Sequence, residues 1–298
     1  MAMDHGAPHP AGEPVIRLAD CHFDEGDLKR LEGVLGKANG MVVFSGPPGC
    51  GKTTTLYACV QYLATPRRKT VTIEQTSYGE IPWATRLECS PAEGLTQPVL
   101  VQSALRTAPD VLMVTTLEHP VTLRLLLRAG LTRQLVLSQC VADNPAAALL
   151  NLQQAQAFPF AVTEVVRLVV GQRLVRRLCP ECSEPLPPSG AELAWLRRLG
   201  ELHQVPELER RQGFRRPVGC IACGQSGFVG HRMIAELLPV TEEVAEAVRQ
   251  GSPAMALRQV AFAAGARHLA YDGVRKAELG LVALADVRAA VGEDEFLG

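Results

Sequence analysis

The chain has 298 residues, 47% of them hydrophobic, and a formal net charge of −1 at pH 7. This length suits about two domains with a sizeable core, and the balanced charge gives no indication of a nucleic-acid partner. No apolar run approaches the roughly 18 residues of a membrane-spanning helix. Residues 1–14 lack the apolar core of a signal peptide. We therefore expect a cytoplasmic protein in which residues 1–27 form a disordered lead-in.

The first elements in chain order surround a glycine-rich loop. Residues 28–35 have the apolar spacing of a helix, and residues 41–44 form an apolar run typical of a buried strand. The next residues, Gly46-Pro47-Pro48-Gly49-Cys50-Gly51-Lys52-Thr53, fit the phosphate-loop pattern G-x-x-x-x-G-K-[ST] at every defined position. A helical pattern follows from Thr54 onward.

This strand–loop–helix order predicts a site for ATP and Mg²⁺. Glycines let backbone N–H groups close around phosphates, and the helix N-terminus adds a field that favours negative charge. The Lys52 ammonium would reach the β- and γ-phosphates, and the Thr53 hydroxyl would bind the magnesium ion. The residues expected to contact the nucleotide are Gly46, Gly49, Cys50, Gly51, Lys52, Thr53 and Thr54.

Apolar strands and amphipathic helices alternate after the loop. Strands are expected at 70–74, 111–114 and 135–138, helices at 99–107, 121–129 and 145–156, and only hairpins and loops at 75–97. This alternation predicts an α/β fold with a mainly parallel sheet and helices on both faces. Phosphate-binding loops lie at the carboxyl ends of such strands.

Two C-x-x-C pairs, Cys179-Pro180-Glu181-Cys182 and Cys220-Ile221-Ala222-Cys223, follow the core. Four thiolates in two knuckles suit a tetrahedral structural Zn²⁺ site, and in a cytosolic chain such pairs favour metal over disulfides. Residues 183–219 between them, with a predicted helix at 191–199, have the character of an insertion. Arginines surround the pairs, but Phe214 is the only aromatic among them, so a solvated face or an acidic partner is favoured over nucleic acid.

The pattern divides the chain into four parts. They are the lead-in 1–27, a nucleotide-binding core 28–177, a zinc-binding module 178–238 with its insertion, and a helical C-terminal tail 239–298.

Five blocks, residues 46–58, 108–114, 130–138, 172–182 and 218–238, resemble in that order the ATPases of type II secretion and type IV pilus assembly. The resemblance extends over residues 40–287. It implies a RecA-like core and a hexameric ring that acts by ATP-driven motion on inner-membrane platform proteins, so the protein would be peripheral to that membrane.

The sequence departs from this family at the positions that the family uses for hydrolysis. The glutamate that activates the attacking water falls on Thr116, and a threonine cannot act as that base. The other departures are Glu118 and His119 in place of Arg and Asp, Gln75 and Thr76 after the retained Glu74, and Gln134 and Val141 in place of two histidines. We also expect residues 1–45 to be too few for the preceding domain that supplies arginine fingers in the family.

A positioned general base contributes about 10²–10⁴ in rate, whereas the loop, its lysine and Mg²⁺ act mainly in binding and positioning. The sequence therefore predicts an ATP-binding protein with impaired hydrolysis. It would have a regulatory or structural role in a secretion or pilus machine, as a homo-oligomer or together with an active paralogous ATPase.

Two alternatives remain. In the first, the chain is an active motor whose base is Glu74 or Glu118. If Glu74 has no catalytic role, we expect it to be a solvated charge at a strand end. In the second, the chain is an AAA+ or DNA-repair P-loop protein, a class in which the same loop sequence occurs. That class carries a strand ending in paired acids, and no such strand is found in this sequence.

Overall fold

The computed structural model describes residues 16–117, 119–155, 160–203, 205 and 208–292. These residues divide into two compact units. The core unit comprises residues 16–171 and 237–264, and the cysteine unit comprises residues 172–236 and 265–292. No described helix combines the length and the apolar character that crossing a bilayer requires.

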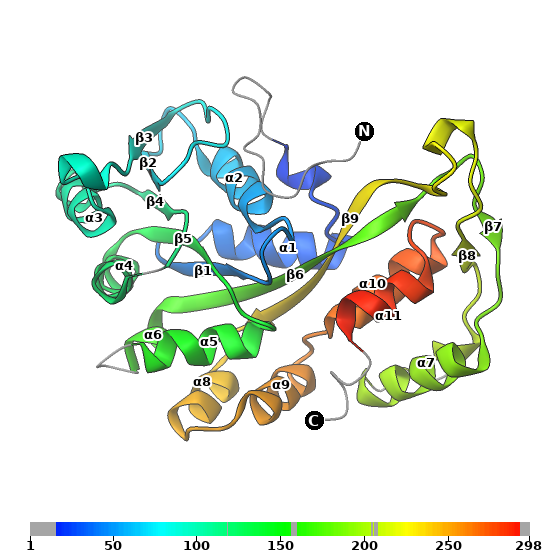
Figure 1. Cartoon of the computed structure of the whole chain (residues 1–298). Helices are drawn as coiled ribbons and strands as arrows, with labels where there is room; N and C mark the ends of the chain where they lie inside the picture. Colours follow the sequence, from blue (N-terminus) through cyan, green and yellow to red (C-terminus); the bar gives the residue numbers. More distant parts are fainter. Residues whose placement is uncertain (1–15, 118, 156–159, 204, 206–207, 293–298) are drawn as a thin grey trace. The chain divides into compact units, whose positions relative to one another are not determined.

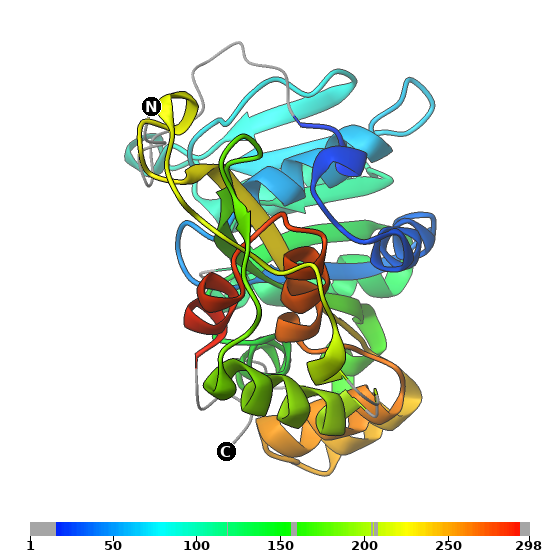
Figure 2. The same cartoon turned by 90° about the vertical axis from the view of Figure 1, so that its right-hand side faces the viewer.

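A seven-stranded sheet with the order β3-β2-β4-β5-β1-β6-β9 organises the core unit (Figure 1). Its strands are β1 Gly40–Ser45, β2 Thr70–Glu74, β3 Ala84–Glu88, β4 Val111–Val114, β5 Leu135–Cys140, β6 Val166–Leu178 and β9 Phe228–Pro239. The first six strands in this order pair in parallel. They run side by side in Figure 2. Two of the strands, β6 and β9, also extend into the cysteine unit.

Helices cover both faces of this sheet. They are α1 Glu25–Leu35, α2 Lys52–Leu63, α3 Gln97–Arg106, α4 Pro120–Thr132, α5 Pro145–Gln154, α6 Phe160–Val165, α8 Glu242–Arg249 and α9 Ala254–Ala263, with 3₁₀ turns η1 Leu18–Asp20 and η2 Pro91–Glu93. The crossover from β1 to β2 leads toward the β3 edge of the sheet. The crossovers from β3 to β4, from β4 to β5 and from β5 to β6 all lead toward the β9 edge. Because such crossovers are right-handed, α2 lies on one face of the sheet, and α3, α4, α5 and α6 lie on the other.

The α/β fold with a mainly parallel sheet confirms the predicted fold class. The four predicted strands all form, because their apolar runs are buried on both faces, as parallel strands require. Local capping fixes where helices begin. The Asp24 carboxylate accepts a hydrogen bond from the Asp27 N–H at 2.7 Å, so α1 starts three residues before the predicted helix.

The prediction for residues 75–97 was wrong in one respect. A strand, β3, forms there and pairs in parallel with β2, from Thr70 opposite Ala84 to Glu74 opposite Glu88. It is a half-exposed edge strand, Ala-Thr-Arg-Leu-Glu, with a single large apolar residue. Main-chain hydrogen bonds to β2 stabilise it, and these leave no periodic signal in the sequence. The long strands β6 and β9 were not predicted either.

The cysteine unit has its own hydrophobic core. Its further elements are β7 Glu184–Pro185, α7 Gly190–His203, η3 Leu208–Arg210, β8 Arg215–Arg216, η4 Ile221–Cys223, α10 Leu269–Glu278 and α11 Leu284–Val291. The fully buried Trp195 of α7 belongs to one cluster with Val274 of α10 and Val287 of α11. The insertion is therefore an integral part of this unit, because its helix contributes to the core.

The predicted helical C-terminus is confirmed, and its helices are divided between the two units. Residues 237–264, with α8 and α9, belong to the core unit, where α8 contacts α6 and α9 contacts α5. By contrast, α10 and α11 bury their apolar faces in the cluster around Trp195. The pair α8 and α9 and the pair α10 and α11 therefore belong to different units, because each pair packs against the apolar surface of its own unit.

A buried ion pair fixes α10 to β9 within the cysteine unit. The Lys276 ammonium lies 2.6 Å from the Asp272 carboxylate and donates to the Met233 carbonyl at 2.7 Å. The same Asp272 oxygen accepts the Ala235 N–H at 2.8 Å. Both charged side chains are nearly inaccessible to solvent. Removal of either one would leave an uncompensated buried charge, at a cost of about 3–5 kcal/mol.

Candidate functional site

The glycine-rich loop joins β1 to α2 at the carboxyl end of β1, in the interior of the sheet. Every residue of β1 is buried. Gly46, Gly49 and Gly51 have φ angles of 145°, 75° and 90°, a region that residues with a Cβ atom rarely adopt. Gly51 is also the N-cap of α2. Since glycine has no side chain that could cap the helix, the first N–H groups of α2 remain available to an anion.

The Lys52 side chain folds back over this loop. Its Nζ atom donates to the carbonyl oxygens of Gly46 at 2.8 Å and Pro47 at 2.7 Å, and lies 3.7 Å from the Cys50 sulfur. The side chain is buried, and none of the described residues forms an ion pair with it. A buried ammonium held by two carbonyl oxygens and a sulfur, and by no anion, is well placed for a phosphate, whose charge would complement it.

Thr53, the predicted magnesium ligand, is held by a residue that the sequence analysis did not single out. Its hydroxyl contacts the side-chain oxygen of Gln139 at 3.2 Å. Gln139 lies near the end of β5, opposite Phe44 of β1. Its carbonyl accepts the N–H of Leu117, just beyond β4, at 3.1 Å. The available signal was a polar residue directly after a buried apolar run, where the carboxyl ends of parallel strands meet.

Glu74, the last residue of β2, is buried and not a solvated charge, since only 1% of it is exposed. The Tyr57 hydroxyl of α2 donates to its carboxylate at 2.5 Å. The same hydroxyl accepts the Tyr78 N–H at 3.2 Å. Burial and the neighbouring carboxylate raise the pKa of Tyr57 far above its usual range. The tyrosine therefore remains a hydrogen-bond donor, and it restrains Glu74 against α2.

The segment after β4 carries Thr116, where the resemblance places the base. Thr115 extends the ladder by donating its N–H to the Ile73 carbonyl at 3.1 Å. The buried side chain of Gln97 donates to the Thr116 carbonyl at 2.9 Å. Glu118 lies outside the described residues. His119 is an N-cap, because its Nδ1 atom accepts the Val121 N–H at 3.1 Å.

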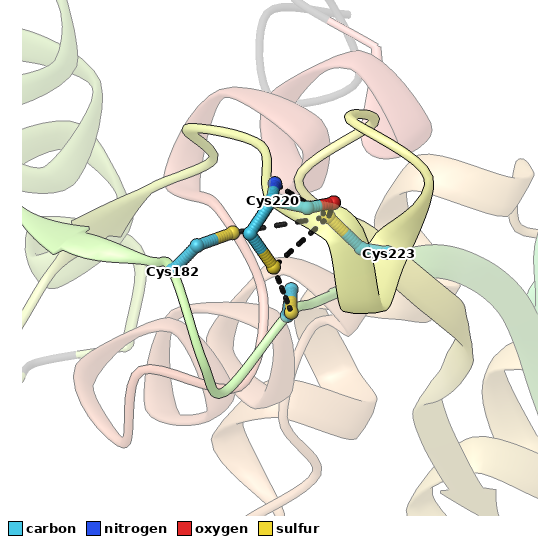
Figure 3. Close-up of side chains that lie close together, drawn as sticks. Cys182, Cys220 and Cys223 are labelled. Atoms are coloured by element: carbon cyan, nitrogen blue, oxygen red, sulfur yellow. Dashed lines mark hydrogen bonds between the residues drawn. The ribbon is translucent and has the colours of Figure 1, made fainter.

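The four predicted metal ligands converge in the cysteine unit. The sulfurs of Cys179, Cys182, Cys220 and Cys223 all lie within 4.8 Å of one another. Three of the separations are 3.9 Å, 3.9 Å and 3.7 Å (Figure 3). Sulfurs about 2.3 Å from a zinc ion lie about 3.8 Å apart in a regular tetrahedron. The cluster therefore has the size and the donor set of a Cys₄ zinc site.

Backbone N–H groups point at these sulfurs. Gly219 donates to Cys182 at 3.3 Å, and Cys220 and Gly227 each donate to Cys223 at 3.2 Å. Burial opposes ionisation of Cys223, but hydrogen bonds from these two N–H groups and from the neighbouring thiols of Cys220 and Cys182 lower the pKa of this thiol to about 6. Thiolate is the form that binds metal. The glycines are required, since a Cβ atom on Gly219 would lie 2.7 Å from a carbonyl oxygen.

A parallel α/β sheet with a glycine loop and a lysine at the helix start defines a P-loop nucleotide-binding fold. The family model "Type II/IV secretion system protein" matches residues 12–289. The chain belongs to this family, as the resemblance predicted. The match argues against the AAA+ and DNA-repair alternative.

Individual relatives agree with this assignment. The chain is 33% identical over 277 residues to the type IV pilus assembly ATPase PilB of Thermus thermophilus, covering 92% of this chain and 30% of the relative. It is 30% identical over 304 residues to the type II secretion system protein E of Aeromonas hydrophila, covering 96% and 58%. The chain thus spans from about a third to somewhat more than half of these relatives.

Solved structures show the same fold. The pilus retraction motor PilT, determined with ADP, matches with a TM-score of 0.67 at 16% identity, covering 95% of this chain and 69% of that one. The Legionella pneumophila ATPase DotB matches with a TM-score of 0.66 at 18% identity, covering 94% and 66%.

Proposed function

We propose that this chain binds ATP and Mg²⁺ through the loop from Gly46 to Thr54 and hydrolyses ATP poorly. The observation that carries the proposal is the position of Lys52, whose ammonium is buried over the loop at the N-terminus of α2 without an ionic partner among the described residues. A triphosphate would supply the missing negative charge. Thr53 would bind the magnesium ion, with Gln139 beside it.

Impaired hydrolysis follows from the residue after β4. The Thr116 hydroxyl does not take a proton from water at neutral pH, and the loss of a positioned base costs about 10²–10⁴ in rate. Glu74 is an unfavourable substitute, since Tyr57 and burial hold its carboxylate against α2. The second candidate function, an active motor, therefore depends chiefly on Glu118.

The cysteine cluster supports a structural role for Zn²⁺. Four thiolates complete a tetrahedron and leave no open position for a substrate or a water molecule. We assign the ion to Cys179, Cys182, Cys220 and Cys223, where it would fix the two knuckles of the cysteine unit to each other.

The place of action is inferred from the relatives, two of which are named a pilus assembly ATPase and a secretion system protein E. By this likeness, the chain would work at the cytoplasmic side of an inner membrane, on platform proteins of a secretion or pilus machine. It would act in a ring, as a homo-oligomer or with an active paralogous ATPase, in a regulatory or structural role.

Binding and turnover measured on one purified sample test the proposal. Calorimetric titration with Mg²⁺ and ATP should show saturable binding, while phosphate release stays far below the roughly 1 s⁻¹ of ordinary enzymes. Turnover at or above that rate would refute the impaired site. The variants Glu118→Gln and Glu74→Gln would then identify the base. Thr116→Glu should restore only part of the rate, because electrostatic stabilisation of the transition state is a separate contribution.

A further inference from the structure

Four arginines gather on α3 and α4, which lie side by side in the core unit (Figure 1). They are Arg106 at the end of α3, Arg124 and Arg128 in α4, and Arg133 directly after it. Residues 97–106 and 120–133 contain these four arginines and no Lys, Asp or Glu, which gives them a formal charge of +4. The whole chain has a formal charge of −1.

All four arginines are exposed, and the described part of the chain offers none of their guanidinium groups an ion-pair or hydrogen-bond partner. Several arginines elsewhere are paired. In the cysteine unit, Arg176 pairs with Asp286 at 2.8 Å, and Arg211 pairs with Glu278 at 2.8 Å. The charge on α3 and α4 is therefore not neutralised by any of the residues that the structure describes.

Helix stability does not account for this arrangement. A cation in the last turn of a helix interacts favourably with the helix dipole, which explains Arg106. However, Arg124 and Arg128 lie before the last turn of α4 and are four residues apart. Like charges at this spacing destabilise a helix by about 0.2–0.5 kcal/mol. The folded chain alone gains nothing from the pair.

A groove of about 470 Å³ lies between the two helices, and arginines border it from both sides. Arg106 comes from α3 and Arg128 from α4, while Leu105, Leu125 and the buried Ala129 supply apolar lining. Next to these residues along the helices, Val99 and Leu131 are about half exposed. The surface thus combines apolar contact area with guanidinium groups.

The groove is remote from the phosphate loop. Gln134, which also lines it, directly precedes β5, whereas the loop follows the end of β1. These two strands are parallel. The groove therefore lies at the amino end of the strands and the phosphate loop at the carboxyl end, so an occupant of the groove would leave the nucleotide site open.

We propose that this α3–α4 groove is a docking site for an acidic, amphipathic segment of a partner protein. Carboxylates of the segment pair with Arg106 and Arg128 in the groove and with Arg124 one helical turn before Arg128, and its apolar side chains contact Leu105 and Leu125. Bidentate pairs between arginine and carboxylate give both strength and orientation. The two helices contain no aromatic residue on which a nucleic-acid base could stack. An apolar recess between the charges also suits side chains better than lipid headgroups.

The test measures binding of a fluorescein-labelled peptide to the full chain by fluorescence anisotropy at low salt. The peptide has roughly 18 residues, enough to form a helix, with leucines on one face and glutamates on the other. Two control peptides replace the glutamates by lysines or the leucines by serines. We expect the glutamate–leucine peptide to bind at least about tenfold tighter than either control.

Two protein variants with equal charge change locate the site. R106E/R128E should weaken peptide binding by about tenfold or more. K37E/R67E changes two exposed residues of the same unit, outside α3 and α4, and should change binding by less than about threefold. Melting curves check that both variants fold. If R106E/R128E does not fold, R106Q/R128Q is used in its place.

The proposal is overturned if the wild-type chain does not bind the glutamate–leucine peptide. It is also overturned if R106E/R128E and K37E/R67E weaken binding equally. Equal affinity for the serine-containing control would reduce the effect to non-specific charge and would also overturn it. So would tighter binding of a single-stranded oligonucleotide or of phosphatidylglycerol vesicles, since these are different classes of partner.

Discussion

At the scale of single residues, the proposed nucleotide site depends on one ammonium group. Lys52 donates to two loop carbonyls and lies where a phosphate would contact the loop. In Lys52→Ala, the affinity for ATP and Mg²⁺ should fall by about 100-fold, because hydrogen bonds to a charged group contribute about 1.5–3 kcal/mol each. Calorimetric titration measures the change.

The matched control for this variant is Lys37→Ala, which removes an exposed lysine from the same unit and should leave ATP binding within about twofold. Unchanged affinity in Lys52→Ala, in a protein that melts like the wild type, would contradict the assignment of the loop.

A second prediction concerns the tyrosine that restrains Glu74. Tyr57→Phe removes the hydroxyl that donates to this buried carboxylate. We expect the free energy of unfolding to fall by about 1–3 kcal/mol, the cost of leaving a buried acceptor short of a donor. The control, Tyr62→Phe, lies on the same helix but is half exposed, and should change stability by less than about 0.5 kcal/mol. Urea titration measures the free energy of unfolding of both variants. Equal values would show that the hydrogen bond from Tyr57 to Glu74 contributes nothing to stability.

At the scale of elements, a glycine determines how closely α4 packs on its neighbours. A Cβ atom on Gly130 would lie 2.5 Å from Val165 Cγ1 and 3.2 Å from the Gly40 carbonyl oxygen. Gly130→Ala should therefore destabilise the chain by about 1–3 kcal/mol through overpacking, although alanine favours a helix by about 1 kcal/mol.

Gly33→Ala in α1 is the matching control, because it has open space around its Cβ position and an ordinary helical backbone. It should stabilise the chain by about 0.5–1 kcal/mol. If both substitutions raised the melting temperature, the close contact of α4 with β1 would not be present in solution.

The zinc knuckles give the second prediction at this scale. The purified protein should contain about one zinc ion per chain. Cys220→Ser should release the ion and lower the melting temperature, because binding of structural zinc is coupled to folding. Cys89→Ser, in the core unit, should retain the metal. Elemental analysis measures both, and stoichiometric zinc after replacement of all four cluster cysteines would contradict the site.

At the scale of the whole molecule, the family assignment predicts nucleotide-dependent assembly. ATP and Mg²⁺ should increase the average mass in light scattering, because a ligand that binds only the assembled form shifts the equilibrium toward it. We expect a weak oligomer that an active paralogous ATPase strengthens. A strict monomer under all conditions, with and without that paralogue, would contradict the proposed role in a ring.

The sequence by itself determined the local features that depend on neighbouring residues. The buried strands, the phosphate loop and the two C-x-x-C pairs could be read directly, because each consists of a few consecutive residues with a fixed chemical pattern. The same holds for Thr116, whose place after a buried strand is visible without a structure. Together these features were sufficient for the fold class and the family.

The tertiary structure decided which distant residues meet. The edge strand β3 forms through main-chain hydrogen bonds to β2, which no side-chain pattern records. Gln139 reaches Thr53 because β5 lies beside β1, and the Tyr57 hydroxyl of α2 contacts Glu74 at the end of β2. The α3–α4 groove arises in the same way, since two crossovers of the same hand bring separate arginines to one surface. Such contacts join residues far apart in the chain, and local periodicity carries no information about them.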